Sequence, residues 1–155
     1  MKKITLFLAV ISLFLVACNN SSSQSENSET AEGKEAQSSK VIHLTKAEFL
    51  EKVVSYETDF DEWEYLGDKP CILDFYADWC PPCKKIAPIL DALSNEYDGQ
   101  IYIYKIDTDE EGELAAAFGI KSIPTLYFIP MKGNPTLSEG ELTKSELKKR
   151  IEAIL

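Results

Sequence analysis

The stretch that decides the fold is residues 71–83, Cys71-Ile72-Leu73-Asp74-Phe75-Tyr76-Ala77-Asp78-Trp79-Cys80-Pro81-Pro82-Cys83. Its first half is an almost continuous apolar run, which is typical of a strand buried on both faces of a parallel sheet. It ends in two cysteines separated by two residues. When such a pair opens a helix, the first sulfur faces free backbone N–H groups and the positive end of the helix dipole. This setting lowers the pKa of a thiol, so we expect a nucleophile at Cys80.

Other uses of a Cys-X-X-Cys pair fit these residues less well. Structural zinc needs four ligands, and the chain has no second such pair and a single histidine, His43. Haem attachment needs histidine directly after the pair, where Lys84 stands. A static structural disulfide remains an alternative if the compartment is oxidising. It does not account for Trp79 before the pair or for Asp74 within an apolar strand. We therefore expect a redox pair that needs no metal and no cofactor.

The N-terminal residues have the layout of a secretory signal. Met1-Lys2-Lys3 is followed by an apolar stretch over 4–16, which is too short for a comfortable membrane span. Leu15-Val16-Ala17-Cys18 resembles the bacterial lipobox, in which the cysteine is diacylated on its sulfur and becomes the new N-terminus. We expect a signal peptide over 1–17 and a lipid anchor at Cys18. Ordinary cleavage without acylation, which would give a soluble secreted protein, is the alternative.

Composition divides the remaining chain into a tether and one domain. Residues 19–40 contain no aromatic residue and no Val, Ile or Leu, so they cannot bury enough surface to offset the entropy of ordering. We expect a lipidated, disordered tether over 18–40 and a single domain over 41–155. Without the two lysines of the signal peptide, 14 basic side chains face 26 acidic ones, a formal charge of −12. This charge argues against nucleic acid and anionic lipid surfaces as partners, and we expect a monomer.

The domain alternates strands and helices. Apolar runs predict strands over 41–44, 71–76, 101–106 and 125–129, with a weak edge strand from Leu137 to Gly140. Helical spacing predicts helices over 45–54, 82–97, 112–118 and 143–155, two of which open with the capping boxes Thr45 to Glu48 and Thr143 to Glu146. Parallel units followed by a hairpin predict an α/β fold with a mixed central sheet and helices on both faces.

The motifs of this domain resemble the thioredoxin family in order and spacing. The matching segments are Val-Ile-His-Leu-Thr at 41–45, Ile-Leu-Asp-Phe-Tyr-Ala-Asp-Trp-Cys at 72–80, Pro-Cys-Lys at 82–84, Ala-Pro-Ile-Leu at 87–90 and Phe-Gly-Ile-Lys-Ser-Ile-Pro-Thr-Leu at 118–126. The resemblance covers essentially all of 41–155 and implies the thioredoxin fold. Two features depart from the family pattern: Pro81 replaces the usual glycine between the cysteines, and the connection over 55–70 is longer than in a minimal thioredoxin.

The resemblance implies a role for several residues around the pair. Cys80, which we expect to be the exposed thiol, would attack a client disulfide, and Cys83 would resolve the mixed disulfide. Asp74 matches the buried family carboxylate that exchanges a proton with the resolving cysteine, and burial raises the pKa of such a group. Lys105 matches the lysine near that carboxylate, with an ordinary solvated lysine as the alternative.

The resemblance also implies a groove for the client protein. Ile123-Pro124 matches the family loop in which a cis proline faces the cysteine pair, and X-Pro bonds adopt the cis form at modest cost. There the backbone of Ile123 would pair with an extended client segment. Trp79, Ile123, Pro124 and Gly140 would bind the client, with core packing as the alternative for Trp79.

Together these features predict a thiol–disulfide oxidoreductase tethered to a membrane of a bacterial cell envelope. We expect it to reduce disulfides in client proteins and to be recharged by a membrane electron donor. The alternatives are a dedicated reductase for one client, such as apocytochrome c, and a binding or chaperone module that keeps the fold without turnover. A disulfide-forming oxidase fits less well, because such relatives carry a helical insertion and a histidine between the cysteines.

Overall fold

The computed structural model describes residues 38–54 and 63–155. Five strands form one sheet in the order β1-β3-β2-β4-β5. The strands are β1 (Ile42–His43), β2 (Cys71–Tyr76), β3 (Tyr102–Asp107), β4 (Thr125–Ile129) and β5 (Thr136–Glu139). β1, β3 and β2 run parallel, whereas β4 is antiparallel to both β2 and β5. The predicted mixed sheet is therefore confirmed.

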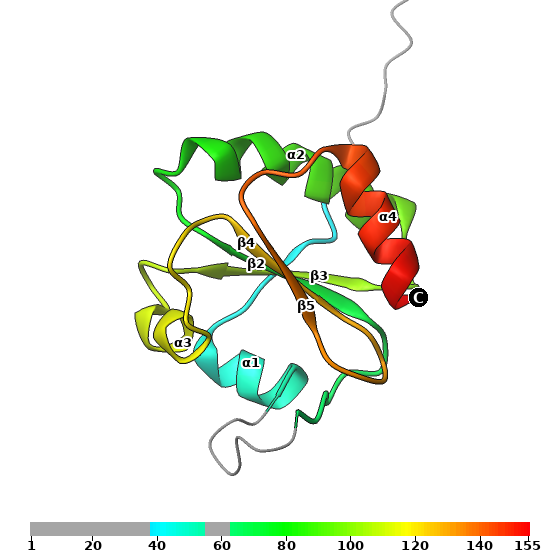
Figure 1. Cartoon of the computed structure of the whole chain (residues 1–155), viewed down its shortest axis with the longest axis horizontal. Coiled ribbons are helices and arrows are strands. Elements are labelled where there is room, and N and C mark those ends of the chain that lie inside the picture. Colours follow the sequence, from blue (N-terminus) through cyan, green and yellow to red (C-terminus); the bar gives the residue numbers. More distant parts are fainter. Residues whose placement is uncertain (1–37, 55–62) are drawn as a thin grey trace, which may run out of the picture. The chain divides into compact units, whose positions relative to one another are not determined.

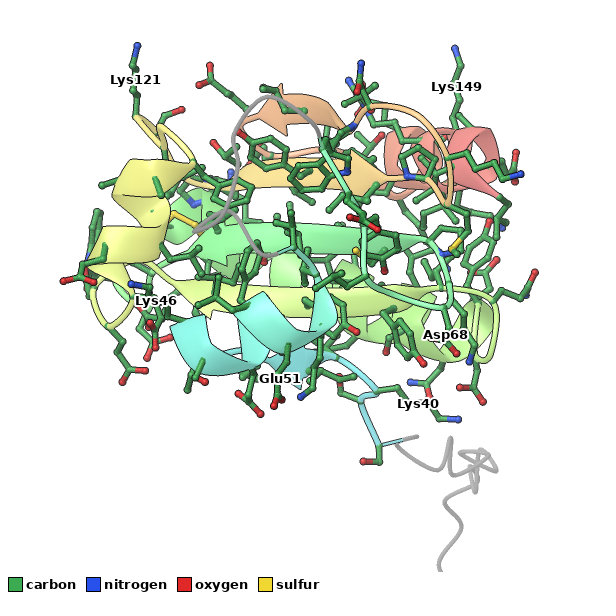
Figure 2. All side chains as sticks on the ribbon, turned by 90° about the horizontal axis from the view of Figure 1, so that it is seen from below. Lys40, Lys46, Glu51, Asp68, Lys121 and Lys149 are labelled. Atoms are coloured by element: carbon green, nitrogen blue, oxygen red, sulfur yellow. A yellow bond between two sulfur atoms is a disulfide. The ribbon has the colours of Figure 1, made fainter. Side chains whose placement is uncertain are left out.

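Within the described residues, four helices cover the two faces of this sheet, as Figure 1 lets the reader follow. α2 (Pro81–Glu96) and α4 (Lys144–Ile154) pack on one face, and α1 (Lys46–Lys52) and α3 (Gly112–Ala117) pack on the other. Figure 2 shows the face that carries α1, with Lys46 and Glu51 marking that helix. Within 38–54 and 63–155, none of the helices combines the length and the apolar character needed to cross a membrane.

Several predicted features fall outside the described residues. These are the signal peptide over 1–17, the lipidated Cys18, most of the tether, and residues 55–62 of the long connection. The last tether residues are described, and they contact the domain. Ser39 donates a hydrogen bond from Oγ to Asp91 Oδ1 at 2.6 Å, and the Lys40 backbone N–H donates to Ser94 Oγ at 3.1 Å. Contacts with α2 therefore begin before residue 41.

β2 lies in the middle of the sheet, and all six of its residues are buried. Ile72 belongs to the core beneath α2 and α4, whereas Leu73 and Phe75 belong to the core beneath α1 and α3. Because side chains alternate along a strand, Asp74 and Tyr76 share the α2 face with Ile72. Because helices cover β2 on both faces of the sheet, nearly all of its side chains are apolar.

The two predicted capping boxes are both present. Thr45 Oγ1 accepts a hydrogen bond from the Glu48 backbone N–H, and the Glu48 carboxylate accepts one from the Thr45 backbone N–H. Thr143 and Glu146 form the same pair of bonds at the start of α4. Each box satisfies two backbone donors that a helix start leaves free, so these helix starts are encoded locally.

Candidate active site

The cysteine pair lies where β2 passes into α2. Cys80 is the N-cap residue of α2, and its Sγ accepts a hydrogen bond from the Cys83 backbone N–H at 3.2 Å. Pro81 occupies the first helical position, where a missing N–H costs no intrahelical hydrogen bond. A disulfide joins Cys80 to Cys83, so the structure describes the oxidised pair.

Cys80 is less exposed than the sequence led us to expect. The residue is 2% exposed and Cys83 is 3% exposed, and both pack with Tyr76 and Ile123. The carbonyl oxygen of Ile123 lies 3.7 Å from Cys80 Sγ. The expectation of an exposed Cys80 is therefore wrong for the oxidised form, because the loop that was expected to border the sulfur also covers it.

Trp79 is 64% exposed, which excludes core packing as its role. Its indole Nε1–H donates a hydrogen bond to Asp109 Oδ2 at 2.8 Å, in the turn after β3. The indole lines a pocket of about 360 Å³ together with Ile123 and residues of α3. Sequence reasoning missed Asp109, because the acidic run over 107–111 has the composition of ordinary solvated surface.

Three further residues that the resemblance implied for the client groove, Ile123, Pro124 and Gly140, lie close together near the pair. The Ile123-Pro124 peptide bond is cis, as the family pattern implied. The Gly140 backbone N–H donates a hydrogen bond to the Pro124 carbonyl oxygen at 2.8 Å. Gly140 has a φ of 82°, in the left-handed region that favours glycine. The structure thus brings Ile123, Pro124 and Gly140 together beside Cys80.

Asp74 is a fully buried carboxyl group in the central strand. Neither of its oxygens has a hydrogen-bond partner. Burial raises the pKa of Asp74 to about 7, and the positive charge of Lys105 partly opposes that rise. Because Asp74 lies two residues before Tyr76 on the same strand face, it faces α2, whose first turn carries Cys83.

Lys105 lies beside Asp74 in the sheet, but no hydrogen bond joins its ammonium to the Asp74 carboxylate. It is the Cα partner of Asp74 in the parallel register of β2 and β3. Its ammonium lies over the ring of Tyr76, 3.8 Å from the ring centroid. Sequence reasoning missed Tyr76 as part of the site. The alternation from Asp74 could have placed it on the correct face.

These residues define a dithiol redox protein: a disulfide at a helix N-terminus, a cis proline beside it and a buried carboxyl group behind it. Comparison with known proteins agrees with that class. The thioredoxin family model matches residues 40–153. The chain is 48% identical over 101 residues to a thioredoxin of Borreliella burgdorferi, covering 65% of this chain and 86% of that protein. It is 38% identical over 109 residues to a thioredoxin of Haemophilus influenzae, covering 70% of this chain and 92% of that one.

The solved structures give the same result. Chloroplastic thioredoxin z superimposes with a TM-score of 0.63 at 27% identity, covering 74% of this chain and 94% of that chain. The chain belongs to the thioredoxin family. Its fold is the thioredoxin fold, and its activity class is that of a thiol–disulfide oxidoreductase.

Proposed function

We propose that this chain is a membrane-tethered, extracytoplasmic thioredoxin that reduces disulfides in proteins of a bacterial cell envelope. The single observation that carries the redox proposal is the Cys80–Cys83 pair at the start of α2, on the strand face that also holds Asp74. The proposed location rests on the signal-like residues 1–17 and the lipobox-like sequence that ends at Cys18.

The proposed reaction moves two electrons from the dithiol to a client disulfide. The Cys80 thiolate attacks one client sulfur, which forms a mixed disulfide and expels the other client sulfur as a thiolate. The Cys83 thiol gives its proton to the Asp74 carboxylate, and the Cys83 thiolate then attacks Cys80 Sγ. This step closes the Cys80–Cys83 disulfide and releases the second client thiolate. The two client thiolates take up protons, one of them returned by Asp74 through solvent.

The groove residues would hold the client while this exchange proceeds. Ile123 presents its backbone next to Cys80 Sγ, where an extended client segment can pair with it. Trp79, Pro124 and Gly140 complete the rim, and Asp109 holds the indole of Trp79 in place. Backbone pairing gives affinity with little sequence selectivity, which suits a reductase with many clients.

Each reducing cycle leaves the pair oxidised, so a donor of two electrons must reopen the disulfide. For a tethered protein we assign this role to a membrane electron donor. Thiol trapping of the pair in intact cells tests the direction of electron flow. We expect Cys80 and Cys83 to be mostly reduced, and a pair found fully oxidised at steady state would contradict a reductase.

Detergent partition tests the tether separately. Cys18→Ala should move the protein from the detergent phase to the aqueous phase and remove label from a fatty-acid probe. Disulfide reduction in vitro should be unchanged, because residue 18 lies outside the thioredoxin match over 40–153. A wild-type protein that is already aqueous and unlabelled would contradict the lipid anchor.

A further inference from the structure

The side chain of Tyr76 connects the cysteine pair to the edge strand β1. Its ring packs with Cys80 and Cys83. Its hydroxyl meets Nδ1 of His43 at 3.3 Å, and the two rings lie edge to face. Since β3 separates β1 from β2 in the sheet, this contact spans β3. Tyr76 therefore reaches across the strand that carries Lys105.

Lys105 has two possible partners within reach of its ammonium. In the sheet register, Lys105 is the Cα partner of both His43 on β1 and Asp74 on β2. Its ammonium lies 3.8 Å from the centroid of the Tyr76 ring, well inside the range of about 6 Å for a cation–π contact. Both carboxylate oxygens of Asp74 lack a hydrogen bond. The aromatic face, rather than the buried carboxylate, therefore holds the ammonium.

We propose that Tyr76 is a positioning residue that holds the Lys105 ammonium away from Asp74, and that His43 fixes the tyrosine ring through its hydroxyl. The inference rests on the proposed role of Asp74 as proton acceptor. An ammonium bonded to Asp74 would stabilise the carboxylate and lower its pKa. An ammonium held on the ring leaves the carboxyl group able to take up and return a proton near neutral pH.

Titratable side chains from the neighbouring strands and turns surround Tyr76. They are Asp74 and Asp78 from β2 and the turn after it, Asp107 and Glu110 from β3 and the turn after it, Lys105 from β3, and His43 from β1. At the start of α2 the ring meets the Cys80–Cys83 disulfide, which has no titratable proton in the oxidised protein. Burial and the carboxylates raise the pKa of Tyr76 to about 12. The ring is therefore neutral throughout a titration of Asp74.

Carbon-13 NMR of the Asp74 carboxyl group in the oxidised protein tests the inference without any turnover. Tyr76→Leu should lower the pKa of Asp74 by on the order of 1 unit, because the freed ammonium can pair with the carboxylate. Tyr76→Phe is the matched control: it keeps the aromatic face but loses the hydroxyl contact that fixes the ring, so it should lower the pKa of Asp74 measurably but less than Tyr76→Leu does. His43→Ala should behave like Tyr76→Phe, because both remove the same contact.

Loss of the ring also admits water to Asp74, and hydration alone would lower its pKa. A Lys105→Met background separates the two causes. In that background Tyr76→Leu should shift the pKa of Asp74 much less than it does in the wild type. An equal shift in both backgrounds, or no shift in the wild type, would overturn the inference. Tyr76→Met also removes the aromatic face, and its flexible, unbranched side chain can fill the vacated space, so it serves as a second variant with the same expectations if Tyr76→Leu does not fold.

Failure of this inference can be told apart from failure of the proposed function. If Asp74→Asn leaves disulfide reduction unchanged, Asp74 is not the proton acceptor. The NMR titration still reports whether Tyr76 controls Lys105, because it is read from the resting protein.

Discussion

Asp74 and Phe75 are neighbours in β2, and their side chains point to opposite faces of the sheet. Phe75 packs against Phe118 and Tyr127, with ring centroids 5.5 and 6.0 Å away. Asp74 is equally buried, yet neither of its oxygens has a hydrogen-bond partner. The α1 face thus holds an aromatic core, whereas the α2 face keeps an ionisable group behind the disulfide.

The contrast shows where this fold gives up stability. Full burial of a phenylalanine side chain stabilises a protein by about 1.5–3 kcal/mol, whereas burial of an unpaired polar group costs about 1–3 kcal/mol or more. An apolar side chain at position 74 would continue the core beneath α2. In the proposed function the carboxyl group at this position serves the chemistry of the cysteine pair, and the aromatic face of the same strand supplies stability that offsets its cost.

The largest effects are expected at the cysteine pair. Cys80→Ser removes the nucleophile and should abolish insulin-type disulfide reduction. Cys83→Ser should still attack and should accumulate mixed disulfides with clients, visible on non-reducing gels. Cys71→Ala is the control, because Cys71 is a free cysteine buried in the opposite core. Equal loss of activity in all three variants would contradict the assignment.

On the aromatic face, the expected effect is on stability alone. Phe75→Ala should lower the free energy of unfolding by about 3–5 kcal/mol, measured by denaturant titration. The milder Phe75→Leu should lose less, because it leaves a smaller cavity. Disulfide reduction per folded molecule should be retained in both variants. A large loss of activity in folded Phe75→Ala would mean that the two faces do not act separately.

On the α2 face, Asp74→Asn should increase stability in a manner that depends on pH. Burial raises the pKa of folded Asp74 to about 7, above its value in the unfolded chain. The wild type therefore loses stability as the pH rises from about 4 through about 7, because the folded carboxyl group must ionise in a buried site. The asparagine variant lacks this loss, so its advantage should grow over that window to at most about 4 kcal/mol. Parallel stability curves for the two proteins would show that Asp74 does not titrate with a raised pKa.

Much of this comparison could be predicted from the sequence, because its signals are local. The apolar run predicted the central strand, and the two Thr-to-Glu capping boxes predicted where α1 and α4 begin. The same run placed Asp74 in that strand, and helical spacing placed the cysteine pair at the start of α2, whereas the roles of these residues came from the family resemblance.

Other features depend on contacts between distant segments, and sequence reasoning did not find them. The burial of Cys80 comes from Ile123, more than forty residues later in the chain. Asp109 contacts Trp79 and Tyr76 contacts Lys105 through single side-chain contacts; strand alternation predicts the face on which Tyr76 lies, but not its contact with the ammonium. The raised pKa of Asp74 was expected from burial, but the position of the Lys105 ammonium could be read only from the structure.

The smallest expected effect concerns Pro81, which stands in the loop that the disulfide closes. Proline has fewer backbone states to lose than glycine when the ring closes, an effect worth about 0.4–1 kcal/mol. Pro81→Gly should therefore raise the reduction potential by roughly 10–20 mV, measured by equilibration with a glutathione buffer. A potential that falls instead would mean that Pro82, which disfavours helical geometry at residue 81, strains the wild-type loop.

The central claim is that Asp74 takes the proton of Cys83 when the mixed disulfide is resolved. The most direct measurement is the rate of client release from a preformed mixed disulfide at Cys80, followed from about pH 6 to about pH 9 in the wild type and in Asp74→Asn. The wild-type rate should rise as Asp74 ionises near its pKa of about 7. The variant should lack that rise and be slower near neutral pH by up to about 10²-fold, with the difference shrinking as the pH approaches the ordinary thiol pKa of about 8.5. Two profiles that superimpose over the whole range would contradict the claim.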